Sequence, residues 1–333
     1  MSKNKTNTGL KDTNASPSAY GWSFQVGAGI SLMLDNITKF SSMKMEGASD
    51  DIEITTPAGK IYAQAKSVTK IGDQSSAAKN LQNSLRTLSQ VAKNGDALEL
   101  IYITNIENPL SSKHKSAFTY GNSYEFSILP DDAQKKILKH VGDDFPATSF
   151  RVHIIRFFGE GDNKFASVKE KISEFLREAL DDKSYTPRLL DSWFTTFMVN
   201  ASDKPDKEKS LELDKKEIIL PIVILAVDTP LNEQEFSKVC DYDNYEEIQQ
   251  RFRTIVYDKT CDYNFYSGVL GDYITKRGSS DRYDYVMNEW ASYGQQFEMI
   301  KDEQLREALI KYLLLTIITQ KTKIEGIRKA ANL

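Results

Sequence analysis

Residues 51–66 read DIEITTPAGKIYAQAK, and this stretch decides the fold of the N-terminal part of the chain. Pro57 and Gly59 take the second and fourth positions of a four-residue turn that begins at Thr56, a favourable β-turn sequence. Apolar and polar residues alternate on both sides of this turn. The segment therefore predicts a β-hairpin.

The two faces of this hairpin differ in polarity, because alternate side chains of a strand share a face. The predicted buried face consists of Ile52, Ile54, Ile61, Ala63 and Ala65. The opposite face carries Asp51, Glu53, Gln64 and Lys66. A two-residue loop pairs Asp51 with Gln64, so polar groups are expected to meet across the hairpin.

The hairpin lies within a longer alternation of helices and strands. Hydrophobic periodicity predicts helices over residues 20–37, 75–93 and 167–180, and strands over 42–45, 97–104 and 150–158. Up to residue 104 the order is α-β-β-β-α-β. The fold class is therefore α/β.

The chain from residue 185 onward is predicted to be mainly helical. Residues 218–227 are strongly apolar and fit either a buried helix or a strand, and residues 301–332 are predicted to form one long helix. Within it, residues 312–318 are too apolar for a half-exposed helix, which indicates deep burial or an oligomer contact.

Three regions are predicted along the chain. They are a disordered leader at residues 1–18, a catalytic domain at 19–182 and a mainly helical assembly or partner-binding domain at 183–333.

Charge is unevenly distributed in this 333-residue chain, whose formal net charge is −4. Residues 1–95 carry 11 lysines and arginines against 7 aspartates and glutamates. A basic band from Lys60 to Lys93 could neutralise phosphates, which makes Lys70, Lys79 and Arg86 candidate DNA-binding residues. The alternative is an ordinary solvated helix face.

Composition excludes several classes of protein. No apolar run is long enough to span a membrane, and two cysteines are too few for a disulfide framework. Three scattered histidines without a Cys-x-x-Cys pair argue against structural zinc. A cytoplasmic protein without a membrane partner is expected.

The polar face of the hairpin has the groups that phosphodiester cleavage needs. That reaction uses an oxygen-ligated hard cation and a positive group that steadies developing negative charge. Asp51 offers a carboxylate, Gln64 an amide oxygen and Lys66 an ammonium. The alternative is a solvated strand face, where these residue types are common.

Several short motifs carry a resemblance to a known family. They are Gly21-Trp22-Ser23-Phe24-Gln25, Glu46-Gly47, Asp50-Asp51-Ile52, Gln64-Ala65-Lys66-Ser67 and Ile103-Thr104-Asn105. Together with the element order they resemble the PD-(D/E)xK nuclease superfamily, in the Mrr-type variant in which Gln replaces the usual acid. The resemblance implies a restriction-endonuclease-like αβββαβ core. More closely, they resemble the nuclease domain of CD-NTase-associated anti-phage endonucleases, over about residues 20–160. The same domain is the effector of Lamassu systems, where it partners an SMC-like ATPase.

The resemblance implies roles for individual residues. Asp51 and Gln64 would bind Mg²⁺ or Mn²⁺, Lys66 would be the catalytic lysine, Glu46 would be a further catalytic residue, and Gln25 would reach the same site. The resemblance leaves the choice between Asp50 and Asp51 open, although the strand face favours Asp51. Glu53 is a secondary candidate because it shares that face.

The expected function is a metal-dependent endonuclease that cleaves double-stranded DNA as the effector of an anti-phage system. The C-terminal half has no recognisable SAVED sensor pattern, so control by assembly is expected, with a homo-oligomer, SMC-like subunits or both as partners. The alternative is a non-catalytic nucleic-acid-binding or scaffold subunit with a degenerate nuclease fold.

Overall fold

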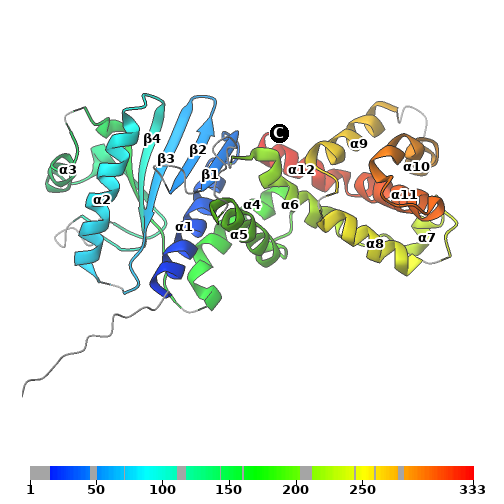
Figure 1. Ribbon diagram of the computed structural model, residues 1–333, viewed down its shortest axis with the longest axis horizontal. Coiled ribbons are helices and arrows are strands. Elements are labelled where there is room, and N and C mark those ends of the chain that lie inside the picture. The colour runs from blue at the N-terminus through cyan, green and yellow to red at the C-terminus, as the bar shows by residue number, and fades with distance from the viewer. Residues whose placement is uncertain are drawn as a thin grey trace, which may run out of the picture. The chain divides into compact units, whose positions relative to one another are not determined.

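A computed structural model shows an α/β protein with a seven-stranded mixed sheet and a mainly helical C-terminal region (Figure 1). It describes residues 16–45, 51–70, 72–110, 118–142, 144–159, 161–202, 212–243, 245–258, 260–276 and 281–333. The strand order is β5-β6-β4-β3-β2-β1-β7. The coarse fold class predicted from the sequence is therefore confirmed.

The strands are β1 (Ser42–Met45), β2 (Ile52–Thr56), β3 (Gly59–Lys66), β4 (Ala97–Thr104), β5 (Ser123–Glu125), β6 (Phe150–Ile154) and β7 (Leu213–Asp214). The helices of the first half are α1 (Ser16–Asp35), α2 (Gln74–Ala92), α3 (Asp131–Leu138) and α4 (Ala166–Leu180). Those that follow are α5 (Thr186–Ser202), α6 (Lys215–Val227), α7 (Glu233–Phe236), α8 (Tyr245–Tyr257), α9 (Tyr263–Lys276), α10 (Arg282–Glu289), α11 (Glu303–Thr319) and α12 (Lys321–Ala331).

The first six elements follow the predicted order, and two predicted boundaries need correction. Helix α1 begins at Ser16, so the predicted leader extends too far, and its residues 1–15 lie outside the described part of the chain. Strand β6 ends at Ile154 rather than at residue 158. It pairs in parallel with β4, with Leu100 opposite Phe150, which places both in the buried part of the sheet.

The chain divides into two compact units, each built from more than one segment. One comprises Met1–Gly29, Ala48–Ile52 and Ile61–Ser167, and the other comprises Ile30–Gly47, Glu53–Lys60 and Val168–Leu333. We call them the first and the second unit. The functional boundary between residues 182 and 183 stays a prediction.

Helix α2 covers one face of the sheet in the first unit (Figure 1). Its leucines at helical spacing face the sheet, and Asp73 caps its start by accepting a hydrogen bond from the Ser76 amide at 3.1 Å. Tyr62 of β3 belongs to the same hydrophobic cluster. Residues 61–65 of β3 are therefore buried on both faces, which argues against the alternative of a solvated strand face.

Helix α11 forms the centre of the second unit. Every residue from Leu309 to Ile318 is buried, and the ring of Tyr312 lies 4.8 Å from that of Phe252 (centroid to centroid). Of the two alternatives for this apolar segment, the structure therefore supports deep burial within the chain. Its apolar circumference gives no evidence for an oligomer contact.

The prediction of one long C-terminal helix is wrong, because the helix is interrupted at Gln320, between α11 and α12. Helix α11 is buried all round, whereas α12 is amphipathic and packs closely on α4, where a Cβ on Gly326 would lie 2.3 Å from the Ala179 carbonyl oxygen. The two segments have different environments, and no glycine or proline at residue 320 signals the break.

Residues 218–227, which the sequence assigned to a helix or a strand, lie in helix α6. Asp214 and Glu217 form a capping box at its start, with both side chain to backbone distances at 2.8 Å. Pro221 lies inside the helix and cannot donate a backbone hydrogen bond. The indole of buried Trp193 donates to the nearby Ile218 carbonyl oxygen at 2.8 Å.

In the described part of the chain, no helix combines the length and apolarity needed to cross a membrane.

Candidate functional site

Asp51 and Lys66 form an ion pair at the base of the β2–β3 hairpin. The Lys66 Nζ lies 2.8 Å from both carboxylate oxygens of Asp51. The Asp51 side chain is 8% exposed and that of Lys66 is 31% exposed. The hairpin therefore holds a largely buried carboxylate against a cation that reaches the surface.

The backbone of β3 also binds the Asp51 carboxylate. The amide of Ala65 donates to Asp51 Oδ2 at 2.7 Å. Asp51 is thus fixed by contacts with two consecutive residues of β3. This agrees with the prediction that Asp51 lies opposite the segment containing Gln64 and Lys66.

Gln64 is buried, with 4% of its surface exposed, yet its amide forms no hydrogen bond with any described residue. A buried amide group normally has hydrogen-bond partners, because burial without them costs free energy. Among the described residues the Gln64 amide therefore has no hydrogen-bond partner, and it precedes Lys66 by two positions on β3.

The secondary candidates do not join this arrangement in the structure. Glu53 pairs instead with Lys60, at 2.9 Å between Nζ and Oε1. Gln25 is half-buried in α1 and makes no hydrogen bond with any described residue. Glu46 and Asp50 lie outside the described residues, so their roles stay predictions.

The donor set of a metal site is incomplete among the described residues. No group of three or more histidine, cysteine, aspartate or glutamate side chains suited to a metal lies in the described ranges. Asp51 and Gln64 nevertheless supply two oxygen donors of the kind that Mg²⁺ or Mn²⁺ accepts, and such ions commonly keep several waters. The residues present fit a hard cation held by few protein ligands.

The predicted DNA-binding residues are all exposed. Lys70 follows β3, and Lys79 and Arg86 lie on the outer face of α2, a helix of 19 residues that contains no acid. That face also carries Asn83 and Gln90. Such a surface can bind phosphates without repelling them.

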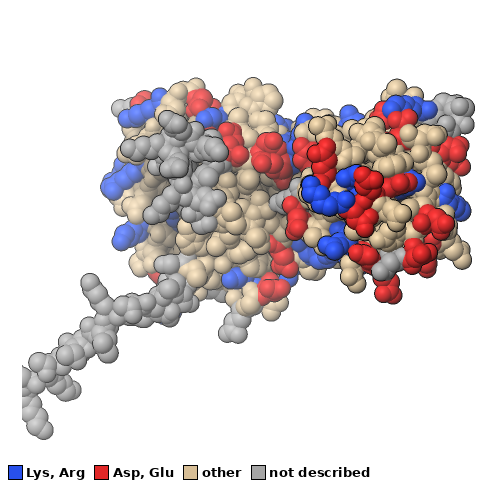
Figure 2. Space-filling model, turned by 45° about the vertical axis from the view of Figure 1, so that its right-hand side comes forward, with Lys and Arg blue, Asp and Glu red and all other residues tan. Residues whose placement is uncertain are grey.

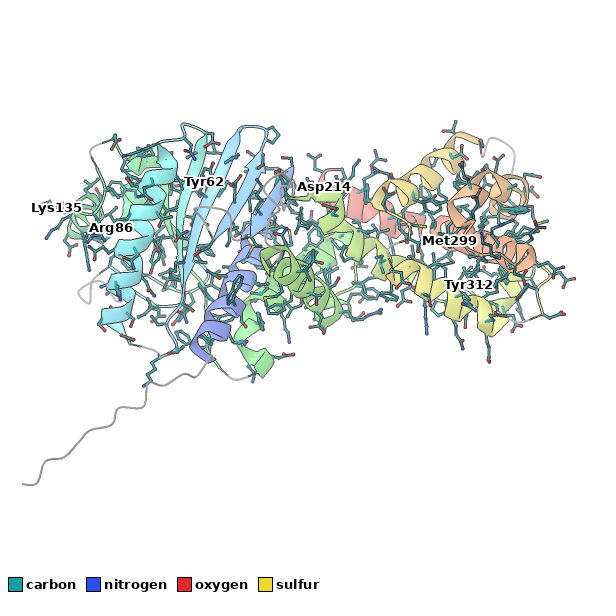
Figure 3. All side chains as sticks on the ribbon, viewed as in Figure 1. Tyr62, Arg86, Lys135, Asp214, Met299 and Tyr312 are labelled. Atoms are coloured by element: carbon teal, nitrogen blue, oxygen red, sulfur yellow. The ribbon has the colours of Figure 1, made fainter. Side chains whose placement is uncertain are left out.

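Helix α3 adds basic residues that the sequence analysis did not single out. Ala133 and Ile137 of α3 belong to the same hydrophobic cluster as Leu88 of α2, so both helices contribute to one core. Figure 3 labels Arg86 on α2 and Lys135 on α3, on the same side of this unit. The sequence offered only a weak signal, because α3 starts with two aspartates.

His140, just after α3, reports this concentration of charge. Its pKa is lowered, first by burial and then by the positive charges of Lys139, Arg86 and Lys136. Arg86 of α2 therefore lies close enough to the end of α3 for its charge to act on His140 together with Lys136 and Lys139.

Asn105 is a structural residue that the sequence motif did not explain. It is fully buried after β4, accepts from the Val68 amide at 2.8 Å, and donates to the carbonyl oxygens of Val68 at 2.8 Å and Phe157 at 3.1 Å. Tyr20 of α1 bonds to the same Phe157 carbonyl, and burial raises the pKa of its hydroxyl. This network ties α1 to the ends of three strands.

Comparison with known protein families, curated proteins and solved structures finds no match to this chain. The nuclease resemblance therefore rests on the motifs themselves. What the site does has to be argued from its chemistry.

Proposed function

We propose that this protein is a metal-dependent endonuclease that cleaves double-stranded DNA. The observation that carries the proposal is the contact between Lys66 and the buried carboxylate of Asp51, on a strand that also carries Gln64, whose amide has no partner among the described residues. A carboxylate, an amide oxygen and an ammonium are the groups that hydrolysis of a phosphodiester requires.

In this proposal Lys66 provides positive charge for the transition state. Its ammonium is partly exposed, so a substrate phosphate can reach it, while Asp51 restricts its position. A pre-positioned charge costs little reorganisation when negative charge develops during the reaction. Asp51 thereby acts as a positioning residue for Lys66 as well as a ligand.

Asp51 and Gln64 would hold Mg²⁺ or Mn²⁺. When bound, such an ion would polarise the phosphate and lower the pKa of an attacking water. The Ala65 amide keeps the Asp51 carboxylate at a fixed place on β3. Glu46 is the further residue proposed for this site.

The surface of α2 and α3 is the proposed DNA contact. Lys70, Lys79 and Arg86 would contact phosphates, which provides affinity without reading sequence. By contrast, Figure 2 shows basic and acidic side chains interspersed over the helical region, with no continuous basic surface on the face in view.

The biological setting follows from the motif resemblance alone. We propose that the nuclease is an effector of bacterial anti-phage defence, controlled by assembly with copies of itself, with SMC-like subunits or with both. Since α11 is buried within the chain, the surface that mediates assembly has to lie elsewhere in the molecule.

The decisive experiment compares two lysines of the same strand. Lys66→Ala should lower the rate of plasmid cleavage in Mg²⁺ by about 100- to 1,000-fold, the usual loss when a charge-stabilising group is removed. Lys60→Ala is the matched control, because Lys60 also pairs with an acid and is equally exposed, at 33%. It should cleave at the parent rate.

Each result bears on one of the candidate functions. Cleavage by the parent should stop when a chelator removes the metal. If Lys66→Ala cleaves like the parent, the site assignment is wrong. If the parent binds DNA and never cleaves it with Mg²⁺ or Mn²⁺, the hypothesis of a non-catalytic binding subunit is favoured. The observation that supports this second function is the face of α2, which carries no acidic residue.

A further inference from the structure

The second unit contains a cavity with a buried lysine. It has a volume of about 430 Å³, within the range of small-molecule sites, and lies where α6 begins, near the labelled Asp214 in Figure 3. Lys39, Lys215 and Lys216 contribute to its lining. The cavity uses no residue of the candidate nuclease site.

Lys215 is the unusual group in this lining. It is 8% exposed, and its ammonium makes no hydrogen bond or ion pair with any described residue. Its ammonium has one described interaction, with the ring of Phe40 at 5.2 Å from Nζ to the ring centroid. Nζ is not one of the fully buried polar atoms that lack a hydrogen bond among the described residues, so the ammonium keeps some contact with solvent in the cavity. A cation–π contact offsets only part of the cost of taking such a charge out of water.

The surrounding charges leave the lining positive. Lys39 is exposed, and Lys216 donates to the Asn264 side chain at 2.7 Å, so neither forms an ion pair with an acid among the described residues. Asp214 caps α6 and keeps its negative charge, so three lysines face one acidic side chain in the lining. The main-chain oxygen of Leu333, also in the lining, accepts from Arg328 at 2.8 Å.

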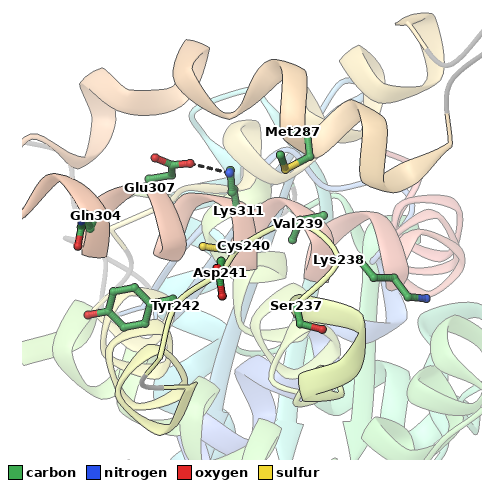
Figure 4. Close-up of a pocket in the computed structure, with 10 residues that line it drawn as sticks. All are labelled: Ser237, Lys238, Val239, Cys240, Asp241, Tyr242, Met287, Gln304, Glu307 and Lys311. Carbon is green, nitrogen blue, oxygen red and sulfur yellow. Dashed lines mark ion pairs between the residues drawn. The ribbon is translucent and has the colours of Figure 1, made fainter.

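A second buried lysine in the same unit has an acidic partner and serves for comparison. Lys311 is 4% exposed and lines another cavity, where its Nζ lies 2.6 Å from Glu307 Oε1 (Figure 4). Lys311 needs no ligand to balance its charge. Lys215 is buried to a similar degree and has no such acid among the described residues.

We propose that the cavity around Lys215 binds a small phosphate-bearing anion. A phosphate group would pair with Lys215 at depth and with Lys39 and Lys216 towards solvent, matching a multiply charged ligand with several cations. The cavity is large enough for a phosphorylated metabolite rather than a bare ion.

Calorimetry with pyrophosphate and inorganic phosphate tests this site on the full chain, at constant ionic strength. The parent should bind pyrophosphate saturably, and Lys215→Met should weaken that binding at least about tenfold, as expected for loss of a charge-assisted hydrogen bond. Lys39→Gln, an exposed substitution, should weaken it less. Lys311→Met and the exposed Lys329→Met are controls that should keep the parent affinity.

Three results would overturn the proposal. They are the absence of saturable pyrophosphate binding by the parent, unchanged affinity in both Lys215→Met and Lys39→Gln, and equal affinity for malonate, a dicarboxylate without phosphate. Because Lys39 is exposed, its variant decides the question even if Lys215→Met fails to fold. The assay measures binding alone, so it does not depend on nuclease activity.

Discussion

Asp51 and Lys215 are both buried charged residues, but the fold treats them differently. Asp51, 6% exposed, contacts the Lys66 ammonium and the Ala65 amide within the same hairpin. Lys215 is 8% exposed, and its ammonium contacts the Phe40 ring without a hydrogen bond or ion pair to any described residue. The first charge is balanced by neighbours that a strand pattern predicts, and the second is not balanced within the described chain.

The contrast teaches where to look for function. A buried pair satisfies itself, so its presence is weak evidence for a role beyond structure. A largely buried charge without a partner in the chain loses part of its hydration, and a ligand of opposite charge can offset that cost. A cleavage assay is therefore needed to assign a function to Asp51. For Lys215, the lack of an ion-pair partner among the described residues itself suggests a ligand.

The largest expected effect on stability comes from breaking the balanced pair. Lys66→Met should lower the free energy of unfolding by about 2–3 kcal/mol, because Asp51 is left buried without its cation. Adding Asp51→Asn to this variant should restore part of the loss by removing the charge. Urea unfolding of the two single variants and the double variant gives the coupling energy, and a coupling near zero would mean that the pair is not formed.

The unbalanced charge should respond in the opposite direction. Without phosphate, Lys215→Met is expected to raise the free energy of unfolding by about 1–2 kcal/mol, since it replaces an unpaired buried ammonium with an apolar side chain of similar length. Thermal melts should show this gain as a higher melting temperature. Saturating pyrophosphate should raise the melting temperature of the parent and leave that of Lys215→Met unchanged. A clear loss of stability in Lys215→Met, larger than that in Lys311→Met, would show that Lys215 has a partner after all.

The smallest effect is a pH dependence of that difference. Burial lowers the pKa of Lys215 from its ordinary value, so the unfolded chain binds more protons than the folded chain as the pH approaches that value. The stability contributed by Lys215 therefore rises with pH in this alkaline range. The gap between Lys215→Met and the parent should narrow from pH 7 to about pH 10. Lys329→Met measured alongside removes the contribution of other titrating groups, and a gap that widens with pH would contradict the lowered pKa.

The hairpin could be predicted because its information is local. The turn at Thr56–Gly59 and the alternation of apolar residues were enough to place Asp51 near Lys66, and hydrophobic periodicity placed α2 and β4. Burial of both faces of β3 was missed because it depends on the packing of Tyr62 under α2. The partner of Glu53 was missed for a similar reason, since alternation assigns a face and not a contact.

The sequence by itself determined the first six elements, their order and the residues proposed for the nuclease site, because turns and periodicities are properties of neighbouring residues. Only the tertiary structure decided that α11 is an internal helix, that the chain breaks at Gln320, and that Arg86 lies near the lysines of α3. It alone also left Lys215 buried without a described partner. These features depend on which distant segments exclude water from a side chain, and burial of a charge is set by all of its neighbours together.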